Sequence, residues 1–255
     1  MCNGSIMDKL ISFSLPLMVS GILQLAFNAV DIIVVGRFSG SQALAAVGST
    51  TALINVFTNL FIGISLGANV LAARFYAAGK DREMSETVHT SITLALISGI
   101  MMAVIGVLLA KWALEIMGTP DDVIGQSALY MRIYFMGMPF FMLYNYGAAI
   151  LRAIGDTKRP LIFLIISGIA NAALNMILVI LFHMGVAGVA IGTIISQLIS
   201  CVLVLTCLYR SEGSYQLRFS KLKINGAYME QIFQVGVPAG IQSTVINLSN
   251  ALLQS

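Results

Sequence analysis

Residues 14–37 read SLPLMVSGILQLAFNAVDIIVVGR, an apolar stretch long enough to cross a membrane as a helix. Its polar residues Ser20, Gln24, Asn28 and Asp31 recur at helical spacing, which places them as a stripe on one face. Asp31 is the only carboxylate inside any of the chain's long apolar segments. A charge at membrane depth is costly and is typical of ion relays and ligand counter-charges. The stretch therefore predicts a helix that forms part of a path through a membrane.

The composition places the whole chain in a membrane. Hydrophobic residues make up 58% of its 255 residues, charged residues make up 10%, and the mean hydropathy is +0.91. Soluble domains carry about 25% charged residues, so this chain could not cover a water-facing surface. We therefore predict an all-α integral membrane protein whose surroundings are the lipid bilayer. The net charge of +3 gives no indication of a nucleic-acid partner.

The sequence contains no recognisable enzyme site. It has no zinc-protease, nucleophile-elbow or phosphate-loop motif, and its three cysteines lack disulfide or metal-ligand spacing. We interpret His89 and His183, each isolated at the end of an apolar segment, as interfacial residues. Without a nucleotide site, any transport must use an ion gradient or be passive. We predict no enzymatic activity and no cofactor.

Six segments have the length of membrane helices, and a seventh begins near Gln234. The fifth and sixth are separated only by the short HMG turn, which predicts a tight antiparallel hairpin. The first apolar run is too long for a signal peptide and should stay in the mature protein. The six segments are Leu10–Val35, Ser49–Ala73, Val88–Ala110, Ala128–Leu151, Leu161–Phe182 and Val186–Tyr209.

Basic residues alternate strongly between the two sides of these segments. With the N-terminus inside, only Arg37, Lys111 and Arg132 fall outside, and the other eleven of the 14 Lys and Arg residues lie inside. This asymmetry predicts a multi-pass protein of the plasma membrane with a cytoplasmic N-terminus. The polar stretch that follows the sixth segment is then a cytoplasmic connector.

The start of the seventh segment repeats the start of the first. FQVGVPAGIQSTVINLSNA resembles SFSLPLMVSGILQLAFNA, and Pro238 and Asn250 align with Pro16 and Asn28 at the same spacing. Repeated halves are typical of secondary transporters. We therefore expect a six-helix lobe over residues 1–209, an inter-lobe connector over 210–233, and a truncated first helix of a second lobe over 234–255. About the same length again should complete that second, C-terminal lobe.

Two features of these helices allow both a structural and a functional interpretation. Pro16 removes a backbone hydrogen bond, so it marks either a static kink or a hinge. Polar side chains on the fifth and sixth segments either hold helices together or line a cavity with Asp31. The glycine pairs Gly63/Gly67 and Gly188/Gly192 indicate close helix packing. The polar residues are Ser167, Asn171, Asn175, Thr193, Ser196, Gln197 and Ser200.

Several stretches together resemble the multidrug and toxic compound extrusion (MATE) transporters. The opening SLPLMVSGILQLAFNAVDIIVVGRFSGSQALAAVG resembles their first helix and the turn after it. Further along, GISLGANVLAARFYAAGK, LRAIGDTKRPL and GVAGVAIGTIISQ resemble the end of their second helix, their loop between helices four and five, and their sixth helix. The likeness covers nearly the whole chain.

The resemblance implies one half of a twelve-helix, pseudo-symmetric exporter of organic cations, drugs or other amphiphiles in exchange for protons or sodium. Asp31 matches the first-helix carboxylate of ion coupling, where a sodium ion could bind, and Pro16 matches the bend of that helix. Asn171, Asn175 and Thr193 match positions around the carboxylate, and some relatives carry an Asp in place of Asn175. The cavity for substrate and ion would also include Gln24, Phe27 and Asn28. We predict no other metal site.

Two other functions fit the same architecture. A flippase for lipid-linked sugars would be expected to place more charge in the lobe cavity, because it handles phosphate. A membrane receptor or assembly subunit without transport would show no flux. The sequence favours the antiporter because Asp31 stands alone, without an intramembrane Lys or Arg beside it.

Overall fold

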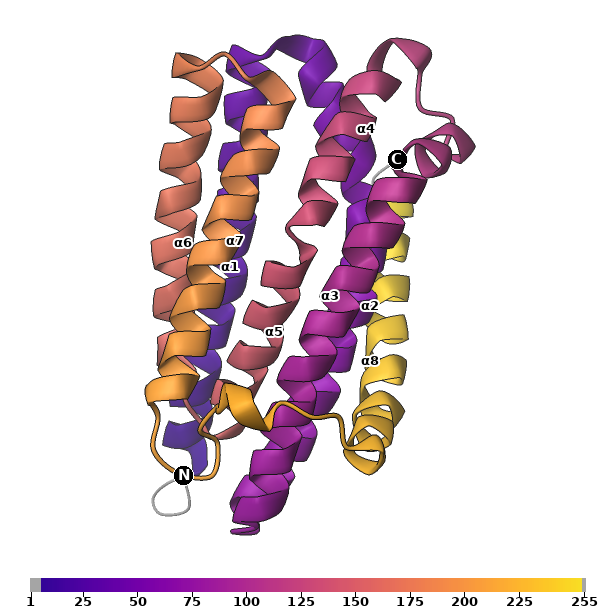
Figure 1. Cartoon of the computed structure of the whole chain (residues 1–255). Helices are drawn as coiled ribbons and strands as arrows, with labels where there is room; N and C mark the ends of the chain where they lie inside the picture. Colours follow the sequence, from indigo (N-terminus) through magenta and orange to yellow (C-terminus); the bar gives the residue numbers. More distant parts are fainter. Residues whose placement is uncertain (1–5, 254–255) are drawn as a thin grey trace.

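The computed structural model describes residues 6–253 and is all-helical over that range. Figure 1 shows the helices running mostly side by side as one bundle. The α-helices are α1 (Ile6–Phe38), α2 (Gly40–Ala77), α3 (Asp81–Ile116), α4 (Asp121–Met136), α5 (Met138–Ala153), α6 (Lys158–Met176), α7 (Gly185–Arg210) and α8 (Gly226–Leu253). A π-helical turn, η1 (Ile177–Leu181), extends α6, and a short 3₁₀ turn, η2 (Phe219–Lys221), lies in the connector.

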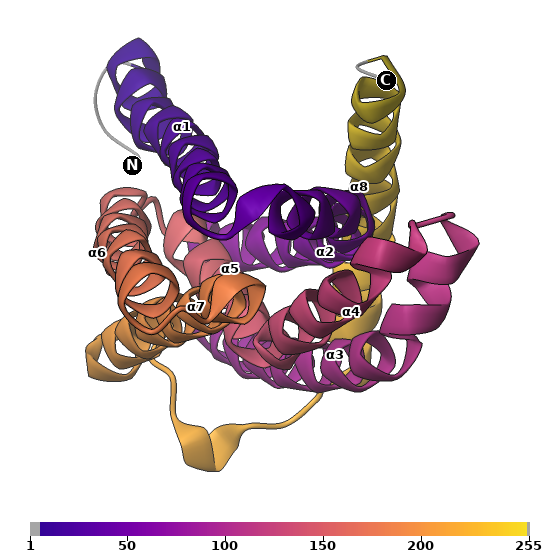
Figure 2. The same cartoon turned by 90° about the horizontal axis from the view of Figure 1, so that it is seen from above.

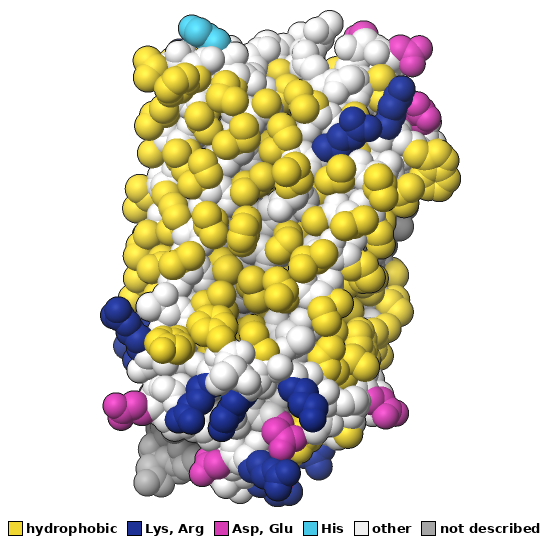
Figure 3. Space-filling view, viewed as in Figure 1, with side chains coloured by type: hydrophobic (Ala, Val, Ile, Leu, Met, Phe, Trp, Pro, Cys, Tyr) yellow, Lys and Arg dark blue, Asp and Glu magenta, His cyan; other side chains and the backbone are white. Residues whose placement is uncertain are grey.

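The bundle has the dimensions and surface of a membrane protein. α1, α2, α3, α6 with η1, and α7 are each long and apolar enough to cross a membrane. Figure 3 shows a broad band of hydrophobic side chains, with charged side chains near the two ends and most basic ones at the lower end. At ~1.5 Å per residue, the 36 residues of α3 extend about 54 Å, beyond a hydrocarbon core of ~30 Å. The predicted fold class is confirmed.

The fourth crossing differs from the sequence prediction. The segment Ala128–Leu151 was expected to be one helix, but the structure divides it between α4 and α5, which meet at Gly137. Pro139 has no N–H for the helical ladder, and its ring would clash with the carbonyl of residue 135 in a continuous helix, which explains the break. The two 16-residue helices still follow one another from one end of the bundle to the other (Figure 1).

α5 forms the centre of the lobe. It contacts α2, α3 and α7, and its residues Tyr146, Ile150 and Leu151 are completely buried. α6 and α7 pack against each other as the predicted hairpin, whose turn places His183 and Gly185 at positive φ. α1 is attached mainly to α6 and α2, and its apolar surface is largely exposed.

α8 starts earlier than the expected start of the seventh segment near Gln234. It begins at Gly226, so residues 226–233 are helical and do not belong to an extended connector. The side chain of Asn225 explains this start, because its Oδ1 accepts a hydrogen bond from the Ala227 backbone N–H at 3.1 Å and thereby caps the helix. The side chain of Asn250, which the internal repeat pairs with Asn28, lies outside the described residues.

α8 packs along α2 through glycines on both helices. Gly63 lies against the backbone of Gly240, and Gly67 lies against the backbone of Ile232 and Gly236. The absence of side chains lets the two backbones approach closely, as predicted for the Gly63/Gly67 pair. Seen from above, α1 and α8 project from the bundle as two separate arms (Figure 2).

We predict that Gly63→Ala destabilises the protein, although alanine is the better helix former. The new Cβ would overlap the backbone of Gly240, so α2 and α8 would have to separate. Gly21→Ala is the matched control, because a Cβ at Gly21 in α1 meets nothing within 4 Å. Thermal unfolding in detergent should show a Tm below that of the parent for Gly63→Ala. The Tm of the Gly21→Ala control should not fall. Equal Tm values for the two variants would contradict the close contact.

Candidate functional site

The candidate site centres on the carboxylate of Asp31, which lies within the apolar span of α1. Asp31 lies toward the end of α1, and its side chain is half-buried where α1 contacts α6 and η1. Among the described residues, the ion pairs are Arg82–Glu86, Lys111–Glu115 and Arg159–Asp156. Asp31 therefore has no cationic partner there, and pairing with Arg37 does not account for its presence.

Neutral polar side chains from two other helices connect to Asp31. The Asn175 amide nitrogen donates to Asp31 Oδ1 and also, at 3.3 Å, to Asn171 Oδ1. Asn171 Nδ2 donates to Thr193 Oγ1 at 3.4 Å, and the Thr193 hydroxyl donates to the Val189 carbonyl at 3.0 Å. One hydrogen-bond chain thus joins α1, α6 and α7 around the carboxylate. These are the residues that the resemblance groups around Asp31.

Gly192 makes room for Asn175, the residue at the centre of these hydrogen bonds. Asn175 is completely buried, and its amide oxygen lies so close to Gly192 that a Cβ there would overlap it. That oxygen has no hydrogen-bond partner among the described residues. Gly192, which the sequence indicated as a packing residue, therefore also sets the position of Asn175 beside Asp31.

The remaining predicted cavity residues lie apart from the carboxylate. Gln24 and Asn28 are exposed, and neither makes a hydrogen bond to the Asp31 group within the described part of the chain. Phe27 lays its ring against Gly168 of α6, and Pro16 is buried in α1. Gln24 lies two turns before Asp31 on the same face of α1, so its exposure shows that this earlier part of the face is not covered by another helix.

Other polar residues on α6 and α7 serve their own helices. The hydroxyls of Ser167, Ser196 and Ser200 each donate to a carbonyl three residues earlier, at 3.1, 2.8 and 2.9 Å. Ser20 similarly donates to the Pro16 carbonyl at 2.8 Å. These bonds satisfy the hydroxyls inside an apolar medium without involving Asp31.

The sequence interpretation did not include polar residues of the fourth crossing, formed by α4 and α5. Tyr130 and Tyr134 lie one turn apart on α4, which packs against α7, and their ring centroids are 6.0 Å apart. The break at Gly137 lies against Gln197 of α7, whose buried Oε1 has no partner among the described residues. Two tyrosines at helical spacing, followed by Gly and Pro inside an apolar segment, are the signal that could have indicated them.

The oxygen atoms around Asp31 are of the kinds that bind a small hard cation. One carboxylate, two amide oxygens and a threonine hydroxyl are the oxygen ligands that such ions prefer, and a proton needs only the carboxylate. No group of three or more His, Cys, Asp or Glu residues able to hold a metal occurs in the described part of the chain.

Comparison with known proteins identifies the family. The MatE family model matches residues 16–177, which include Pro16, Asp31, Asn171 and Asn175. The chain belongs to the MATE family. Members of this family are membrane transporters and not enzymes, which confirms the corresponding predictions from the sequence.

Curated MATE relatives align with nearly all of this chain. A probable multidrug resistance protein, YoeA of Bacillus subtilis, is 34% identical over 246 residues, covering 93% of this chain and 53% of the relative. The multidrug export protein MepA of Staphylococcus haemolyticus is 28% identical over 257 residues, with coverage of 96% and 56%. This MATE chain thus spans about half the length of the curated relatives it matches.

Solved MATE structures share the fold. A MATE structure described as bent superposes with a TM-score of 0.89 at 22% identity, covering 98% of this chain and 55% of the other. One described as straight gives 0.88 at the same identity and coverage. At this identity, the likeness establishes the lobe architecture.

We predict a measurable coupling between Asp31 and Asn175 in this MATE lobe. Asn175→Ala removes the donor and leaves the half-buried carboxylate unsatisfied, which should cost roughly 1–3 kcal/mol. In an Asp31→Ala background the same change should cost less, because no charge remains to satisfy. A double-mutant cycle of unfolding free energies in detergent measures the difference. Additive effects would show that the two side chains do not interact.

Proposed function

We propose that this chain forms the first lobe of a cation-coupled antiporter that exports organic cations, drugs or other amphiphilic molecules. The observation that carries the proposal is Asp31, a carboxylate at membrane depth surrounded by neutral donors and without a cationic partner among the described residues. Such a group can bind either a coupling ion or a cationic substrate. The relatives named as multidrug resistance and export proteins support the substrate class.

The proposed exchange is a competition for one negative charge. With Asp31 ionised, the Asn175 amide donates to it and a cationic substrate is attracted to the cavity. A proton on Asp31 removes that attraction. A sodium ion would instead require oxygen ligands, which Asn171, Thr193 and the unpartnered amide oxygen of Asn175 offer. Either ion would thus displace the substrate without any other titrating group in the network.

Pro16 supplies the proposed point of bending in α1. Most of α1 is only lightly packed, so a change at Asp31 can be transmitted to its other end without disrupting the bundle. Solved relatives described as bent and as straight match this lobe equally well, which supports a fold that tolerates both shapes. Gln24 and Asn28, exposed in this lobe, would contact the substrate on the open side of α1.

A complete transporter on this scheme needs a second lobe. Alternating access requires two halves around the substrate, and the internal repeat of α1 in α8 indicates where the second half begins. The basic ends of the helices would face the cytoplasm of the cell whose plasma membrane holds the protein, with the N-terminus inside. Residues 210–225 would then cross on the cytoplasmic side, and the helix from residue 226 onward would open the second lobe.

The orientation can be tested by cysteine labelling in intact cells, in a variant without native cysteines. Ser220→Cys lies on the exposed connector, and Asp121→Cys lies on the exposed start of α4 at the opposite end of the bundle. A membrane-impermeant maleimide should label Asp121→Cys and should reach Ser220→Cys only after permeabilisation. Labelling of Ser220→Cys alone in intact cells would reverse the proposed orientation.

Replacing Asp31 tests the function directly. In the full-length transporter, Asp31→Asn keeps the size of the side chain and removes its charge, so we expect normal expression and loss of ion-driven export. Efflux of ethidium from an exporter-deficient strain measures the loss, with Ser98→Ala, a buried change distant in sequence, as the expression-matched control. Export by Asp31→Asn at the parent rate, with an unchanged dependence on the ion gradient, would contradict the mechanism.

Residues 1–255 alone should export nothing.

A further inference from the structure

The connector between α7 and α8 is fastened to the start of α3. Asn225 Nδ2 donates to Glu86 Oε2 at 2.8 Å, and the Asn225 backbone N–H donates to Thr90 Oγ1 at 3.2 Å. The Arg218 backbone N–H donates to His89 Nε2 at 3.1 Å. His89, predicted to be interfacial, is buried beneath the connector. These bonds hold two separate parts of the connector against one face of α3.

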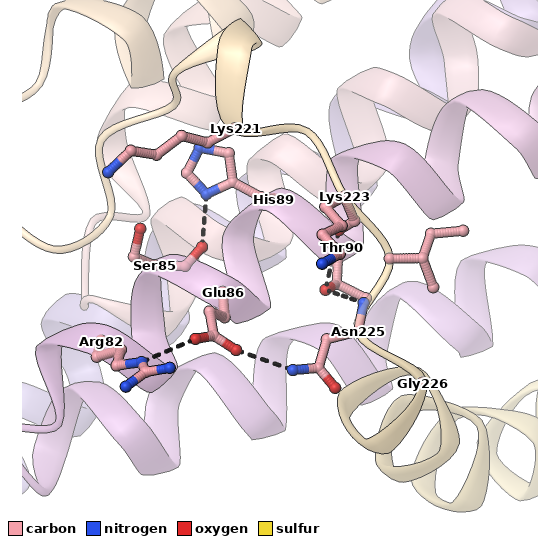
Figure 4. Close-up of a pocket in the computed structure, with 10 residues that line it drawn as sticks. Arg82, Ser85, Glu86, His89, Thr90, Lys221, Lys223, Asn225 and Gly226 are labelled. Carbon is pink, nitrogen blue, oxygen red and sulfur yellow. Dashed lines mark hydrogen bonds and ion pairs between the residues drawn. The ribbon is translucent and has the colours of Figure 1, made fainter.

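A cavity of about 780 Å³ lies between the connector and α3, within the size range of small-molecule sites. Figure 4 shows Arg82, Ser85 and Glu86 reaching it from α3, and Lys221 and Lys223 from the connector. The first turns of α3 lie at the basic end of the bundle, where that long helix extends past the apolar band. The cavity is therefore at the level of lipid headgroups or of the adjoining water.

The charges lining this cavity do not balance. Glu86 is the one carboxylate among its described lining residues, and it is already engaged by Arg82 Nε at 3.0 Å and by Asn225. Lys221 and Lys223 are exposed and form no ion pair with any described carboxylate. Two unpaired ammonium groups from the connector thus share a cavity with a guanidinium from α3. An anion between them would neutralise this excess of positive charge.

We propose that this cavity binds a phosphate-bearing anion, supplied by the headgroup of an anionic phospholipid or by free phosphate. Lys221 and Lys223 would contact the phosphate oxygens, and the Ser85 hydroxyl and the free N–H groups of Arg82 are further donors from α3. The bound anion would join the connector to the first lobe. Only the choice of inner-leaflet lipid as a source rests on the orientation proposed above.

A general preference for basic residues at the cytoplasmic end explains why lysines occur here, but not their convergence. That preference places charges in loops without regard to partners. Here cations from two elements far apart in sequence border one cavity, and hydrogen bonds fix the loop that carries two of them. The distinction can be measured, because Lys80 and Lys158 are exposed lysines at the same end that do not line the cavity.

The test is lipid and phosphate binding by the purified full-length protein in detergent, followed by native mass spectrometry and thermal unfolding. Phosphatidylglycerol should bind and raise the Tm, and zwitterionic phosphatidylcholine should do neither. The double variant Lys221→Gln/Lys223→Gln should bind phosphatidylglycerol roughly tenfold or more weakly, given the contribution of each lysine near an anionic surface. The control Lys80→Gln/Lys158→Gln should bind as the parent does.

Comparing the Tm shifts caused by inorganic phosphate and by phosphatidylglycerol identifies the source of the phosphate. A rise in Tm with inorganic phosphate equal to that with phosphatidylglycerol would assign free phosphate, and a rise with the lipid alone would assign the headgroup. Undiminished phosphatidylglycerol binding by Lys221→Gln/Lys223→Gln would overturn the proposal, as would an equal loss in the control double variant. Because no readout involves transport, failure here would leave the proposed antiport unaffected.

Discussion

The contact between Asp31 and Asn175 is the constraint on which the rest of the lobe depends. No water is available in the hydrocarbon core, so a carboxylate there must be satisfied by protein groups. The structure provides a single completely buried amide from α6. That amide is supported by Asn171 and fits only because position 192 is glycine. The spacing of α1, α6 and α7 is therefore set by one polar group and its immediate neighbours.

The same constraint separates the lobe into a fixed and a loosely held part. α5 is enclosed by α2, α3 and α7 and carries completely buried side chains, so it forms a rigid centre. α1 is largely exposed and contacts the bundle mainly through α6 and α2. A change in the charge of Asp31 thus acts on the helix with the fewest contacts to lose. This arrangement suits a helix that must move while the remainder of the lobe stays intact.

Hydropathy was sufficient to predict most of the fold. The long apolar segments, the HMG hairpin and the close glycine contacts follow from local properties of the chain, and the structure shows them. Hydropathy does not reveal the break of the fourth crossing at Gly137, because the apolar run continues across Pro139. The start of α8 at Gly226 was missed because it depends on a cap by Asn225 in a stretch that is not especially apolar. The burial of His89 could not be predicted, because only the folded connector covers it.

The candidate site was predictable in part. Asp31, Asn171, Asn175 and Thr193 could be grouped from polar residues at helical spacing and from the family resemblance. The exposure of Gln24 and Asn28 could not be predicted, because it depends on how far along α1 the neighbouring helices cover its polar face. Gln197 meets the broken fourth crossing at Gly137 through tertiary packing, which periodicity does not describe.

The central claim is that coupling ion and substrate compete for the charge of Asp31. Equilibrium binding of radiolabelled tetraphenylphosphonium to the full-length protein, measured across pH and sodium concentration, tests it most directly. The account predicts that the Kd of the parent rises as protons or sodium ions are added, and that Asp31→Asn binds weakly with a Kd insensitive to both. A Kd for Asp31→Asn that still rises with either ion as steeply as in the parent would place the competition elsewhere and contradict the account.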